Sequence, residues 1–160
     1  MVNLILEKTA QVRFFTEMRS VFSALGIRAC DYDWFLSDVE MNRNVAGFVV
    51  QDQWLAGDQL ERLITAEEIQ FIWAVFSAVP VGTRFDVKNA PFADGNSTFW
   101  HGAGGRPQLD GSLFEIVCWD SSATLLIGID QEVADHFRAV YSDTRLLFEC
   151  NQAFEGGSQA

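Results

Sequence analysis

The chain has 160 residues, 49% of them hydrophobic and 13% aromatic, which suits one globular domain and excludes intrinsic disorder. Its 22 acidic and 11 basic residues give a formal net charge of −11. This charge argues against a nucleic-acid partner, because such binding depends on Lys and Arg at phosphates. No apolar run approaches the roughly 20 residues that span a membrane, and the N-terminus lacks the pattern of a secretory signal. We therefore expect a cytoplasmic protein without membrane contact, with one domain over residues 1–152 and a flexible tail over 153–160.

The first quarter of the chain predicts a helix followed by a hairpin. Apolar residues recur at helical spacing from Thr9 to Leu25, and Gly26 is a suitable C-cap. The stretches 31–42 and 45–54 are typical of two strands joined by a polar turn.

The middle of the chain predicts helical structure. A short helical turn is expected over 58–64. A longer helix is expected over 65–79, because Thr65 and Glu68 match a capping box, an apolar stripe follows, and Pro80 ends it.

The second half predicts strands and a final helix. Residues 83–87 indicate a short strand, and 113–119 and 123–129 are apolar runs separated by a turn, which is typical of a strand pair. Asp130 then opens a helix that extends to about residue 141. The predicted order is α-β-β-α-β-β-β-α: an α+β fold in which an antiparallel sheet of about five strands is packed by three helices on one face.

Acidic residues gather in two blocks. Residues 31–68 hold nine acidic and two basic residues, and 110–160 hold the same numbers. If both blocks fold onto one side of the molecule, they create a negative field that attracts a basic partner. The alternative is that acidic charge serves solubility alone.

The segment DYDWFLSDVE opens the first block. In a regular strand Asp31 and Asp33 point to one face, where they could share a divalent cation, while Asp38 and Glu40 point to the other. Because the two pairs lie on opposite faces, a single four-carboxylate metal site is excluded. We favour a strand with charged ends and an apolar middle, and we expect no metal and no cofactor.

Residues 89–112 form a long loop rich in Gly, Pro, Asn and Ser, as functional or mobile loops often are. Within it HGAGGR is similar to a phosphate loop, but Pro107 follows and no helix opens, so a flexible loop is the better interpretation. His101 is the best candidate for a general base, although no nucleophile motif accompanies it. Phe99 and Trp100 are either exposed interface anchors or a cover over the core.

Three segments together, DYDWFLSDVE, EEIQFIWAVFSAVP and FEIVCWDSSATLLIG, resemble small α+β immunity proteins from bacterial toxin–immunity loci. The resemblance spans about residues 30–140 and implies a protein without chemistry of its own that neutralises a toxin by binding it. A toxin that acts on nucleic acid is often basic, so an acidic protein suits it. We expect the contact residues to be acids of the first block and the loop aromatics, namely Asp31, Asp33, Asp38, Glu40, Asp58, Glu61, Phe99 and Trp100. The alternatives are a small hydrolase or transferase that uses His101 with nearby carboxylates, or a non-catalytic ligand-sensing domain.

Overall fold

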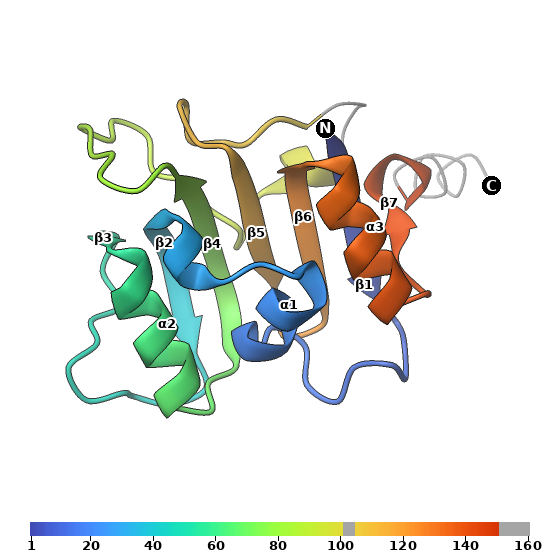
Figure 1. The fold of residues 1–160 in the computed structure, drawn as a ribbon, viewed down its shortest axis with the longest axis horizontal. Coiled ribbons are helices and arrows are strands. Elements are labelled where there is room, and N and C mark those ends of the chain that lie inside the picture. Colours follow the sequence, from blue (N-terminus) through green and yellow to red (C-terminus); the bar gives the residue numbers. More distant parts are fainter. Residues whose placement is uncertain (101–104, 151–160) are drawn as a thin grey trace.

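The computed structural model describes residues 1–100 and 105–150 and contains one antiparallel sheet in the order β3-β2-β4-β5-β6-β1-β7. Three α-helices pack on one face of this sheet, and the described residues of the loop 80–113 (80–100 and 105–113) cover part of the other (Figure 1). The predicted α+β class and antiparallel sheet are confirmed. The sheet has seven strands instead of about five. The strands are β1 Val2–Glu7, β2 Asp33–Met41, β3 Gln53–Leu55, β4 Phe71–Val79, β5 Phe114–Trp119, β6 Ala123–Ile129 and β7 Arg145–Leu146.

The helices are short. They are α1 Met18–Leu25, α2 Gly57–Ala66 and α3 Gln131–Val140, with 3-10 turns η1 Ala29–Asp31 and η2 Ser97–Trp100. Residues 147–150 are also α-helical, so the described chain has four α-helical segments instead of the three predicted. The predicted helix after Asp130 and the short helical turn at 58–64 are both confirmed, as α3 and α2.

Each central strand is buried on both faces. Along β4, Ala74, Phe76 and Ala78 contribute to the core beneath the helices. Val75 belongs to a second, smaller core, in which Ala93 and Phe99 of the loop 80–113 cover the sheet. Strand alternation therefore divides the apolar residues between a helix-covered face and a loop-covered face.

The predicted helix over 65–79 is wrong, because residues 71–79 form the central strand β4. This segment is apolar at nearly every position, so a helical stripe can be traced through a strand whose two faces are both covered. Its aromatic and β-branched residues favour a strand. The Thr65–Glu68 capping box does not open a helix, since α2 ends at Ala66.

The N-terminal region also differs from the prediction. Residues 2–7 form β1, which pairs with β6 and β7, and this strand was not predicted. The predicted helix 9–25 begins only at Met18, where the side chain of Glu17 accepts a hydrogen bond from the Ser20 amide. Thr16 just before it has a positive φ of 63°, which interrupts any helix that starts earlier.

The other strand predictions are mixed. Strands 113–119 and 123–129 are confirmed as β5 and β6. Of 45–54, only the end is extended, within the three-residue β3. Residues 83–87 are not a strand; they belong to the loop 80–113.

The strand alternation predicted for DYDWFLSDVE holds over only part of it. Asp31 lies in η1, ahead of β2. The register of β2 against β4 shifts between Ser37 and Glu40, where Asp38 adopts a positive φ of 54°. This bulge turns Asp38 away from the face that simple alternation predicts.

Candidate functional site

Three carboxylates fix the loop 80–113 to the sheet, and the first is Asp33, only 5% exposed. It accepts hydrogen bonds from the Gly57 amide (3.0 Å), the Gly82 amide (2.8 Å) and the Arg84 guanidinium (2.8 Å). Burial by itself opposes ionisation, but the two amides and Arg84 outweigh it and lower the pKa of Asp33. Asp33 thus joins α2 and the start of the loop to β2.

Asp38 is the second carboxylate that fixes the loop to the sheet. Its carboxylate accepts hydrogen bonds from the amides of Ala93 and Asp94, both at 2.8 Å. The bulge in β2 explains this contact, because it directs the side chain toward the loop. Ala93 is fully buried against the sheet at this point.

Glu115 is the third anchor and is fully buried in the middle of the sheet. Its carboxylate accepts hydrogen bonds from Ser77 Oγ (3.0 Å) and from the amides of Gln108 (2.9 Å) and Leu109 (2.9 Å). Burial raises the pKa of Glu115, and these three donors only partly oppose the rise. Sequence reasoning missed this residue, although a single Glu inside the apolar run LFEIVCW is a signal of a buried, specifically bonded carboxylate.

Phe99 and Trp100 cover the sheet. Their rings meet Trp119 edge to face, with centroid distances of 6.0 and 5.1 Å. Phe99 is only 9% exposed, and both residues contact the loop-covered core. The structure thus places these aromatics as a cover over the core, which was one of the two expected arrangements.

Asp31, Asp58 and Glu61 come together where η1 meets α2. Gly57 makes this approach possible, because a Cβ at that position would lie 1.9 Å from the Tyr32 carbonyl oxygen. Asp31 and Asp58 are exposed. Glu61 forms a two-point ion pair with Arg28, at 3.0 and 3.2 Å.

The remaining predicted contact residue is Glu40. It is exposed near the end of β2, whereas Asp31 lies before the start of that strand, so Glu40 does not belong with Asp31, Asp58 and Glu61. The eight predicted contact residues therefore fall into separate places. Asp33 and Asp38 anchor the loop, Phe99 and Trp100 cover the sheet, and Asp31, Asp58 and Glu61 share one surface.

Tyr32 links the two acidic blocks of the sequence. Burial raises the pKa of its hydroxyl, and the carboxylates of Asp31 and Asp130 raise it further. Asp31 belongs to the first block, whereas Asp130 is the N-cap of α3 and belongs to the second. Carboxylates from both blocks thus act on one aromatic side chain. We call the surface formed by Asp31, Asp58, Glu61 and Asp130 around Tyr32 the acidic face.

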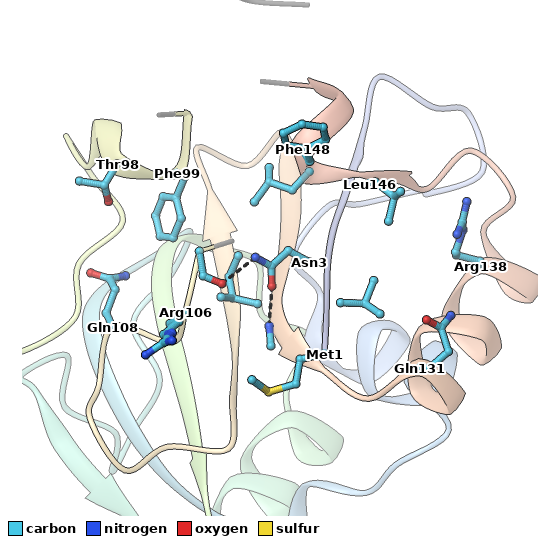
Figure 2. A pocket seen from close by; sticks show the side chains of 15 residues that line it. Met1, Asn3, Thr98, Phe99, Arg106, Gln108, Gln131, Arg138, Leu146 and Phe148 are labelled. Carbon is cyan, nitrogen blue, oxygen red and sulfur yellow. Dashed lines mark hydrogen bonds between the residues drawn. The ribbon is translucent and has the colours of Figure 1, made fainter. Parts of the chain in front are cut away.

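A cavity of about 730 Å³ opens beside β1 and β6, between α3, the segment 146–148 and the loop that precedes β5 (Figure 2). Apolar side chains form much of its wall, among them Phe99, Ile127, Leu146, Leu147 and Phe148. Arg106 and Arg138 also line it. Sequence reasoning missed this site, because its residues come from distant parts of the chain.

His101 and most of the HGAGGR segment lie outside the described residues. The other histidine, His136, places Nδ1 2.8 Å from the Ala24 carbonyl oxygen and so joins α3 to α1. Across residues 1–100 and 105–150, no group of three or more His, Cys, Asp or Glu side chains is arranged to hold a metal ion. In the same residues, no helix combines the length and apolar character needed to cross a bilayer.

Comparisons with known proteins do not assign the chain to a family. A scan against protein-family models gives no match, and searches among curated proteins and solved structures return none either.

Proposed function

We propose that this protein is a non-catalytic, immunity-type binding protein whose acidic face engages a basic toxin, such as a nuclease. The observation that carries the proposal is that Asp31 and Asp130 both lie near enough to Tyr32 for their charges to raise the pKa of its hydroxyl. This supports an arrangement in which carboxylates from two acidic parts of the sequence share one surface, which is the condition under which their fields add.

The charge of the acidic face is only partly compensated. Arg28 pairs with Glu61, and Arg62 lies 3.4 Å from Asp58. The structure gives no ion pair for Asp31 or Asp130 in the described part of the chain. An excess of exposed carboxylates on one surface steers a basic partner and raises the association rate.

Tyr32 is the aromatic anchor that this surface offers. Its ring meets Trp34 and Phe114 edge to face, with centroid distances of 5.8 and 5.1 Å. The side chain is only part-buried, so its position is fixed by packing while part of it stays accessible. A rigid, part-exposed tyrosine surrounded by charge has the character of an interface hot spot. This role moves the expected anchor from Trp100 to Tyr32.

The test starts with co-purification of the protein with the product of the adjacent gene. Association rates are then measured for the variant Asp31→Asn, Asp58→Asn and Asp130→Asn. Asn preserves side-chain shape, and the Asp130 side chain makes no capping hydrogen bond that the substitution would remove, so the fold should persist. We expect association about tenfold slower at low salt, with a smaller change in dissociation.

A matched control removes the same three charges elsewhere, by Asp86→Asn, Asp110→Asn and Asp120→Asn. These residues are exposed and lie in the loop 80–113 and the β5–β6 turn. If the control slows association as much as the acidic-face variant does, net charge alone acts and the acidic face is not the binding surface. If the adjacent gene product does not bind at all, the immunity role is rejected.

A further inference from the structure

The arginines of this protein differ in the groups that they contact. Six of them pair with carboxylates, namely Arg19, Arg28, Arg43, Arg62, Arg84 and Arg145. Arg13 lies over the ring of Phe14. Arg106 and Arg138 have no carboxylate at ion-pair distance among the described residues, and both line the 730 Å³ cavity. Figure 2 shows them on opposite sides of it, with Asn3 between them.

The rest of the cavity wall suits an anion with an apolar body. Among the described residues that line it, none is acidic, although the chain has 22 acidic residues. Polar side chains, including Thr98, Gln108 and Gln131, accompany the apolar ones. The wall therefore combines positive charge, hydrogen-bonding groups and apolar surface.

The wall near Arg106 is held in place on both sides of that residue. On the N-terminal side of Arg106, the side chain of Asn3 holds the backbone. Its Nδ2 donates to the Gly105 carbonyl oxygen at 2.7 Å, and its Oδ1 accepts from the Gly128 backbone amide at 2.8 Å. On the C-terminal side of Arg106, Pro107 packs on Gly128 so closely that a Cβ there would lie 3.1 Å from the proline ring. The Gln108 amide is then bound by buried Glu115.

We propose that this cavity binds a small organic anion, a carboxylate carried on a hydrocarbon or aromatic body. The carboxylate contacts Arg106 or Arg138, and the apolar body lies against Phe99, Ile127 and Leu147. The volume falls within the roughly 300–1,000 Å³ of ordinary ligand pockets. The fixed backbone on each side of Arg106 lowers the cost of ordering the site. This inference does not depend on the acidic face or on the immunity role.

The test uses octanoate as the probe and follows backbone amide signals of the full chain by NMR titration. We expect saturable shifts at Asn3, Gly128 and Gln131. Arg106→Gln and Arg138→Gln should together weaken octanoate binding about tenfold or more, since charge-assisted hydrogen bonds are lost. Arg62→Gln, on the exposed side of α2, is the matched control and should leave octanoate affinity unchanged.

Two further probes separate the parts of the ligand. Octanol lacks the charge and inorganic phosphate lacks the apolar body, so each should bind at least about tenfold more weakly than octanoate. The proposal is overturned if octanoate gives no saturable shift. It is equally overturned if the double arginine variant binds octanoate as wild type does, or if octanol or phosphate binds as well as octanoate.

Discussion

The two faces of the sheet are covered in different ways. On the helix-covered face, α1, α2 and α3 pack through apolar side chains such as Phe22, Leu60 and Phe137. On the loop-covered face, irregular backbone lies over the sheet, and its amides are held by Asp33, Asp38 and Glu115. A helix satisfies its own backbone, whereas a loop over a core needs acceptors from elsewhere. Asp33, Asp38 and Glu115 therefore serve the fold as acceptors for the loop, whereas Asp31, Asp58 and Asp130 remain exposed.

Gly57→Ala should disrupt packing on the helix-covered face and have the largest effect on the free energy of unfolding. The new Cβ would lie 1.9 Å from the Tyr32 carbonyl oxygen and 2.6 Å from that of Ala29, so η1 and α2 must separate. We expect a loss of about 3 kcal/mol or more in the free energy of unfolding, measured by urea denaturation. A loss below about 1 kcal/mol would show that these elements are not tightly packed. Gly47→Ala is the comparison variant: no atom lies within 4 Å of a Cβ at that exposed position, so its loss should reflect only the positive φ of 78°, about 1 kcal/mol.

Glu115→Ala should loosen the loop on the loop-covered face, with a slightly smaller effect on the free energy of unfolding. It leaves Ser77 Oγ and the amides of Gln108 and Leu109 without their acceptor in a buried site. We expect a loss of about 2–3 kcal/mol, together with faster hydrogen exchange at residues 108 and 109. Glu115→Gln keeps one acceptor oxygen and should lose less. Unchanged exchange in the alanine variant would contradict the anchoring role.

The two buried anchors should respond to pH in opposite directions. Asp33 has a lowered pKa, so its contribution to stability is present above the ordinary Asp range and is lost as pH falls through its folded-state pKa. Glu115 has a raised pKa, so the folded state binds its proton more tightly than the unfolded state does. Its stability contribution is therefore greatest below the ordinary Glu range and declines as pH rises through the folded-state pKa.

Urea denaturation across pH 3–8 checks this contrast in two variants. The stability advantage of wild type over Asp33→Asn should grow with rising pH, and that over Glu115→Gln should shrink. Slopes of the same sign for both variants would show that the two carboxylates do not sit in different electrostatic environments.

Arg62→Gln should have the smallest effect. Arg62 and Asp58 form an i, i+4 ion pair with both side chains largely exposed, at 73% and 65%. We expect a change in the free energy of unfolding below about 0.5 kcal/mol, measured by urea denaturation and reduced further by salt. A loss above 1 kcal/mol would mean that the surface of α2 has a structural role that the packing of the helix does not indicate.

Local sequence patterns predicted those helices and strands whose sequence shows a single apolar face or a clear polar turn. The β5–β6 pair was predictable because two apolar runs flank a polar turn, and α3 because its apolar residues follow one helical face. Strand β4 was not, since residues covered on both faces fit either periodicity. Strand β1 was missed because its partner β6 lies more than a hundred residues away.

The candidate sites were less predictable because their contacts are not local. The amides bound by Asp38 lie 55 and 56 residues further along the chain, so the sequence indicated acidic charge without its role. Asp58 is exposed near the start of α2, where a helical turn was predicted, whereas Asp31 is exposed in η1 and not in the strand that was predicted for it. The cavity with Arg106 and Arg138 exists only once β1, α3 and the loop before β5 are assembled.

The salt dependence of the association rate with the adjacent gene product tests the central claim most directly. For wild type we expect the rate to fall steeply as salt rises, because exposed carboxylates steer a basic partner. The variant lacking the charges of Asp31, Asp58 and Asp130 should show a clearly shallower dependence, while the variant altered at Asp86, Asp110 and Asp120 should stay close to wild type. Equal slopes for all three proteins would contradict the assignment of binding to the acidic face.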